Sequence, residues 1–121
     1  GYGSEPIATS AQNLDAGVKI DRYEGEPKNT LLPVQHVTLS SLSSESKIID
    51  MINRVDASFD PRAQTHQSES IKITSSQARV LLQLIPFTYH DLESYPDYEV
   101  HSTNIELDGK YYLVIVSVPK L

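Results

Sequence analysis

The chain has 121 residues, enough for one domain with a core of modest size. Its formal net charge of −6 and sequence pI near 5.0 argue against a nucleic-acid-binding surface, which would be basic and clustered. Because it contains no cysteine, disulfides, thiolate metal sites and cysteine nucleophiles are excluded, and no apolar run approaches the roughly 18 residues of a membrane-spanning helix.

The first 30 residues show no hydrophobic period of 2 or 3.6. Turn-forming residues interrupt this stretch at Pro6, Gly17, Gly25 and Pro27. A segment that buries little apolar surface does not offset the entropy lost on ordering. We therefore expect a flexible tail or linker over residues 1–30, with Val18–Ile20 as a possible short strand, followed by a single domain over residues 31–121.

The domain is expected to begin with a strand and a helix. Residues 34–39 are rich in β-branched side chains and end at a serine pair, which predicts a strand. Ser43 and Ser44 are suitable N-cap residues for the helix, and Glu45 would lie in its first turn. The apolar stripe of this helix comprises Ile48, Ile49, Ile52, Val55 and Phe59. Pro61 disfavours the α conformation at the preceding residue, so the helix ends there.

A second strand and a second helix follow a polar loop. Residues 62–70 are polar throughout, and residues 71–74 alternate as a short strand. The serine pair at 75–76 would cap the next helix, which continues to Ile85 and is apolar around most of its girth. We therefore expect this helix to be buried on more than one side. Residues 87–97 are interpreted as a connecting loop.

The C-terminal stretch predicts a β-hairpin, because Asp108-Gly109 tolerates the positive φ angles of a type I′ turn. A two-residue loop sets Leu107 opposite Lys110. That register places Tyr112, Val114 and Val116 opposite Ile105, Thr103 and His101 on the more apolar face. The second strand of the hairpin is apolar on both faces. Such a strand is usually interior to a sheet, and its faces are either covered on each side or exposed to a partner. An edge position, open to a partner's strand, is the other possibility.

The resulting order of strand, helix, strand, helix, strand, strand predicts a small two-layer α+β sandwich.

Candidate catalytic residues are few. His36 and His101 fall on predicted strands, whereas His66 and His90 fall on predicted loops. A metal site needs ligands at set spacings or in a dense cluster, and only residues 89–93 come near one, so we expect no metal and no other cofactor. His101 is expected to be half-buried and hydrogen-bonded.

The carboxylates of Glu93, Asp97 and Glu99 are expected on a solvated loop, where general acid–base catalysis is not favoured. The serines at helix entries are explained by capping, and the dispersed glycines form no phosphate-binding loop. The sequence therefore predicts a non-enzyme. A small enzyme that uses His90 or His101 with a nearby carboxylate is a less favoured alternative.

Five of the seven tyrosines fall in the C-terminal third. Tyrosine combines a large apolar area with a polar tip, which suits half-exposed positions at an interface or at the rim of a core. The hairpin register groups Tyr111, Leu113 and Ile115 on the face opposite Tyr112. We predict these three as partner-binding residues.

The succession of predicted elements also resembles that of a known family. The similar segments are residues 58–61 (Ser-Phe-Asp-Pro), 70–74, 77–85 and 98–115. Across residues 34–118 the pattern resembles the secretin N-terminal domain (N0 or STN), found in secretins, TonB-dependent signalling receptors and secretion-system lipoproteins. The chain departs from that family in lacking Thr-Gly after the first helix and in having a longer connection between Pro86 and Pro96.

The resemblance implies a periplasmic or outer-membrane-associated docking module of a secretion, pilus or receptor assembly, without catalytic residues. Its partner would be another assembly component or a second copy, and a lipid anchor could precede the given residues. The alternative is an acidic cytoplasmic immunity-type protein that masks a partner enzyme. The acids between Asp91 and Glu99 and the net charge of −6 motivate it.

Overall fold

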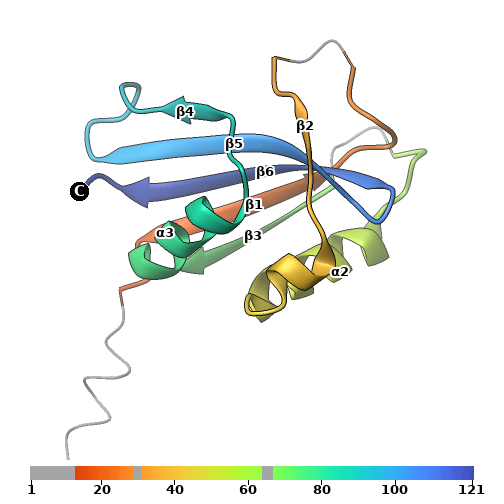
Figure 1. The fold of residues 1–121 in the computed structure, drawn as a ribbon, viewed down its shortest axis with the longest axis horizontal. Helices are drawn as coiled ribbons and strands as arrows, with labels where there is room; N and C mark the ends of the chain where they lie inside the picture. The colour runs from red at the N-terminus through yellow and green to blue at the C-terminus, as the bar shows by residue number, and fades with distance from the viewer. Residues whose placement is uncertain (1–12, 29–30, 64–66) are drawn as a thin grey trace, which may run out of the picture.

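The computed structural model describes residues 13–28, 31–63 and 67–121. Two α-helices of this part lie on one face of a six-stranded sheet, which confirms the predicted α+β class (Figure 1). The strand order is β2-β5-β6-β1-β3, and β4 pairs with β5 as well. The elements are β1 (Ala16–Arg22), β2 (Val34–His36), the 3₁₀ turn η1 (Leu39–Leu42), α2 (Ser46–Ser58), β3 (Ser68–Ile73), α3 (Ser75–Leu84), β4 (Tyr89–Asp91), β5 (Tyr98–Leu107) and β6 (Lys110–Pro119). Neither helix is long and apolar enough to cross a membrane.

The prediction of a flexible tail over residues 1–30 is wrong for Ala16–Arg22, which form strand β1. It pairs antiparallel with β6 on one side and with β3 on the other. Ala16, Val18 and Ile20 are buried and alternate with Gly17 and more exposed residues, so a period of two is present. The small side chains at positions 16 and 17 weaken that signal in the sequence. Residues 1–12 and 29–30 lie outside the described part.

The hairpin matches its prediction. Asp108 and Gly109 have φ angles of 51° and 77°, as a type I′ turn requires. Leu107 pairs with Lys110 and Ile105 with Tyr112, so the predicted register is confirmed. Strand β6 lies between β5 and β1, so its expected alternative position at a sheet edge is wrong.

The helices differ from expectation at their ends and in their burial. Helix α2 has Glu45 at its N-cap, so Ser43 and Ser44 are not its caps. Helix α3 is capped by Thr74, in a capping box with Gln77, rather than by the serine pair. Val80 of α3 is 44% exposed, so the prediction of burial on more than one side is wrong. The sheet is the only layer that α3 packs on in the described structure.

The shortest strands were not predicted correctly. β2 ends at His36, and the chain then turns into η1 instead of continuing as a strand to Leu39. β4 lies in the stretch expected to be a loop, and β3 starts three residues before the predicted strand, at Ser68. Both three-residue strands pair with β5, so contacts distant in sequence define them rather than a local pattern.

The core lies between the sheet and the helices. The sheet contributes alternate residues, among them Ile20 of β1, Tyr112 and Val114 of β6 and Ile105 of β5, all at most 1% exposed. Helix α2 contributes Ile48, Met51, Ile52 and Val55, and α3 contributes Ala78 and Leu81. One sheet face is therefore covered by helices, and the function must be sought on the other face, at the edges and at the ends.

Candidate functional site

The sheet face opposite the helices is called the outer face here. By register and alternation it carries Gly17, Lys19 and Asp21 of β1, Ser68, Ser70 and Lys72 of β3, Ser102, Asn104 and Glu106 of β5, and Tyr111, Leu113, Ile115 and Ser117 of β6. The three predicted binding residues thus share this face, and each is partly exposed. Lys19 pairs with Ile115, and Asp21 pairs with Leu113, across β1 and β6.

Chain that follows β1 covers one end of the outer face. The hydroxyl of Tyr23 donates to Asn104 Oδ1 at 2.7 Å, and Asn104 Nδ2 donates to the Leu32 carbonyl at 3.0 Å. Asn104 lies on the outer face but is fully buried, because the chain that carries Tyr23 and Leu32 covers it. Burial raises the pKa of Tyr23, so its phenol stays a neutral donor. Tyr111 lines a hollow of about 470 Å³ at this covered end.

The opposite end of the outer face is open. A hollow of about 390 Å³ lies there over β6, β1 and β3, with Ile115, Lys19 and Lys72 among its lining residues. Gly17 contributes no side chain between Ser117 and Lys72, its partners on the two neighbouring strands. This absence hollows the surface beside Ile115. Of the three predicted residues, Ile115 therefore lies nearest the open groove, whereas Tyr111 lies at the covered end.

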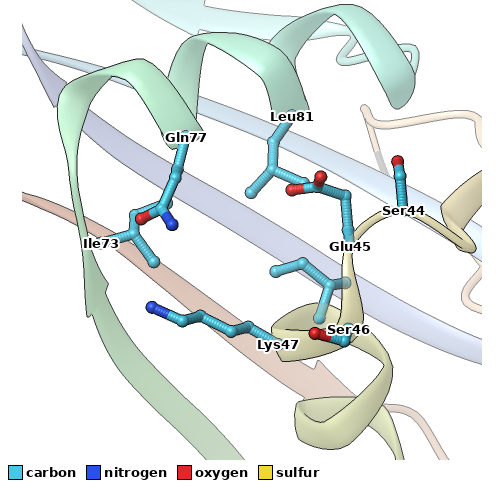
Figure 2. A pocket seen from close by; sticks show the side chains of 8 residues that line it. Ser44, Glu45, Ser46, Lys47, Ile73, Gln77 and Leu81 are labelled. Carbon is cyan, nitrogen blue, oxygen red and sulfur yellow. The ribbon is translucent and has the colours of Figure 1, made fainter.

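A smaller hollow of about 160 Å³ lies between the start of α2 and α3 (Figure 2). Its buried apolar members are Ile48, Ile73 and Leu81. Glu45 and Lys47 bring charged groups to its lining. The side chain of Gln77 is already bound to the backbone of Thr74 in the capping box. The lining combines apolar core residues with single charges of either sign, and we assign no chemistry to it.

Four side chains of the described residues form a continuous hydrogen-bonded series, called the polar chain here. Arg79 Nη1 donates to Glu99 Oε1 at 2.7 Å, and the same oxygen lies 2.9 Å from His101 Nε2. His101 Nδ1 lies 2.6 Å from His90 Nδ1. The prediction for Glu99 and His90 needs correction, because Glu99 lies on β5 with its side chain 16% exposed, and His90 lies on β4.

Hydrogen bonds from His101 and Arg79 lower the pKa of Glu99. The ionised carboxylate accepts a hydrogen bond from the Nε2–H of His101. A single proton fits between the two facing Nδ1 atoms, so one imidazole donates and the other accepts. Both nitrogens of His101 are therefore hydrogen-bonded, and its ring is T-shaped to that of Phe87 with 6.4 Å between centroids.

This geometry fastens elements together. Arg79 also donates to the Pro119 carbonyl at 2.9 Å, so the polar chain links α3, β5, β4 and the end of β6. His101 is hydrogen-bonded as expected, but at 7% exposed it is buried rather than half-buried. Arg79 was not singled out from the sequence, because nothing in a helical arginine indicates which strand it meets.

The other carboxylates of the β4–β5 connection do not form a pair. The Asp91 carboxylate accepts from the backbone N–H groups of Ser94 and Glu93 at 3.0 and 3.2 Å, which lowers its pKa. Glu93 and Asp97 are exposed. Within residues 13–28, 31–63 and 67–121, no group of three or more histidines and carboxylates is arranged to hold a metal ion.

No protein-family model, curated protein or solved structure was found to match this chain. Its function is therefore argued from its own surface.

Proposed function

We propose that this chain is a non-enzymatic protein-binding domain that contacts its partner through the outer face of the sheet. The observation that carries the proposal is the one-sided packing of the helices, which leaves Leu113 and Ile115 partly exposed on the other face. Apolar side chains clustered on an open surface are typical of contact sites. Lys19 and Asp21 beside them supply the polar surroundings that such a contact needs for specificity.

The cellular setting is part of the same proposal. It rests on the resemblance of residues 34–118 to the secretin N-terminal domain, which favours a periplasmic place in a secretion, pilus or receptor assembly. The residues encoded before Gly1 in the native gene test it. A signal peptide with a lipobox cysteine is the expected result, and an unprocessed cytoplasmic start would contradict it.

A second candidate is an inhibitor that masks the basic surface of a partner enzyme. It is favoured by the segment from Tyr89 to Tyr98, in which four large apolar side chains are exposed: Tyr89 at 53%, Leu92 at 51%, Tyr95 at 52% and Tyr98 at 38%. Acids lie between them at Asp91, Glu93 and Asp97. Aromatic anchors among acids suit a cationic partner surface.

Site-specific photo-crosslinking in cells of the native host separates these candidates. A photoreactive phenylalanine analogue is placed at position 115 on the outer face, at position 95 in the acidic segment, or at position 80, which is exposed on α3. The proposal predicts a discrete adduct from position 115 alone. An adduct from position 95 alone supports the inhibitor, and equal adducts from all three positions contradict a defined binding face.

A further inference from the structure

Strand β3 is an edge of the sheet with its backbone open on one side. Arg22 N donates to Gln67 O at 3.3 Å, which fixes the phase of the β1–β3 ladder. In an antiparallel ladder every second residue bonds to the neighbouring strand, so those at 69, 71 and 73 face β1. The N–H and C=O groups of Ser68, Ser70 and Lys72 therefore point away from the sheet. No described residue bonds to them.

Hollows flank this edge on both faces of the sheet. The open groove of about 390 Å³ lies on the outer face, and a second hollow of about 180 Å³ lies between β3 and α2. Ile71 and Lys72 line both of them. A strand added at β3 would send alternate side chains to the two faces, where these hollows can receive them.

The edge is cationic, although the whole chain carries a formal charge of −6. The two hollows are lined by four of the ten lysines and arginines, namely Lys19, Lys47, Arg54 and Lys72. Asp50 is the single carboxylate in either lining. Glu69, nearby on β3, is paired with Arg54 at 2.8 Å. The surplus of positive charge complements an acidic segment.

We propose that β3 binds an extended acidic segment of the partner protein as an additional strand of the sheet. The inference rests on the proposed function in taking the partner to be a protein, and it names the mode of binding. The segment's backbone bonds to Ser68, Ser70 and Lys72, and its carboxylates lie near Lys19 and Lys72 on the outer face. A second copy of this chain fits less well, because pairing β3 with itself brings two cationic edges together.

The test uses ¹⁵N-labelled chain and an acetylated, amidated octapeptide of alternating valine and glutamate, with a valine–lysine octapeptide as control. We expect the acidic peptide alone to shift the amide resonances of Ser68, Ser70 and Lys72 and to slow their hydrogen exchange. Ser70→Pro removes an outward N–H at an edge position where proline is tolerated, and it should weaken binding by about tenfold or more. Ser70→Thr keeps that N–H and should bind like the parent chain.

Lys72→Glu should weaken binding of the acidic peptide and strengthen binding of the valine–lysine peptide. Equal binding of both peptides by the parent chain, unchanged binding by Ser70→Pro, or no binding of the acidic peptide overturns the inference. Each of these results leaves the crosslinking pattern from position 115 intact, so failure of the edge mode is distinguishable from failure of the outer face. Dimerisation of the chain without peptide, lost in Ser70→Pro, also overturns it in favour of self-pairing.

Discussion

The phenolic oxygen of Tyr112 lies 2.8 Å from Asp56 Oδ1, which joins the turn end of the hairpin to helix α2. The same carboxylate accepts from Arg22 Nη1 at 3.0 Å, and Lys110 lies 3.6 Å from its other oxygen. Asp56 therefore connects α2 to β1 through Arg22 and to β6 through Tyr112 and Lys110. These contacts hold α2 against the inner face of the sheet.

Tyr112→Phe tests that connection with almost no change in shape. Tyr112 is 1% exposed, and its hydroxyl donates to a charged acceptor, so its removal should cost about 1.5–3 kcal/mol of unfolding free energy. Equilibrium urea unfolding at neutral pH measures this loss. Tyr111→Phe on the other face is the matched control, and a similar loss in both variants would contradict a specific role for Tyr112.

The same bond predicts a dependence on alkaline pH. Burial, and then the Asp56 carboxylate, raise the pKa of Tyr112 far above its ordinary value of 10.0. A group whose pKa is raised in the folded state contributes stability below its unfolded pKa and loses it as pH rises. Stability should therefore fall above pH 10, and Tyr112→Phe should show a smaller fall in unfolding experiments between pH 8 and about 11.

Glu99 predicts the opposite dependence in acid. Its pKa lies below the ordinary value of 4.5, because His101 and Arg79 donate to the ionised form. A lowered folded-state pKa contributes stability above the unfolded value, and this stability is lost as pH falls below 4.5. Glu99→Gln should be less stable than the parent chain at pH 6 and should lose less stability below pH 4.5. Urea unfolding from pH 6 down to about pH 3 measures this, and parallel curves would contradict it.

His90→Ala should loosen β4. The His90 ring is bonded to His101, and β4 has only three residues to pair with β5. Loss of one hydrogen bond should cost about 1 kcal/mol and should speed amide exchange at residues 89–91 and at the strand residues opposite them. His36→Ala removes a histidine that is bonded to Glu106 at the far end of β5 and serves as the control. Equal exchange at β4 in the parent and His90→Ala would show that the ring does not hold this strand.

Local patterns in the sequence were sufficient for the hairpin. The Asp108-Gly109 turn fixes the register, and the register alone places Leu113 and Ile115 on the outer face and Val114 on the inner face. Only Val18–Ile20 of strand β1 is indicated by the sequence, as a possible short strand in a flexible tail. Its full extent and its central place depend on pairing with β3 and β6, which come from distant parts of the chain. Its own alternation is obscured by Ala16 and Gly17.

The polar chain and the open edge depend on topology. Arg79 reaches Glu99 only because α3 packs beside β6, and His90 reaches His101 only because β4 pairs with β5. No spacing in the sequence indicates these contacts. The edge strand is likewise set by topology. Because β1 is inserted beside β6, the open edge of the sheet is β3 and not the last strand of the chain.

The most direct test of the outer face compares glutamate at two adjacent positions of β6. Val114 is 1% exposed in the core, so Val114→Glu buries an unpaired charge and should unfold the domain in a thermal unfolding experiment. Ile115→Glu should keep a cooperative transition with a small change in Tm, and so should Leu113→Glu. In a chain that carries the photoreactive residue at position 113 instead of 115, Ile115→Glu should abolish the adduct with the partner in the native host. If Ile115→Glu unfolds the protein as severely as Val114→Glu, the outer face is covered within the domain, and the proposed binding face is contradicted.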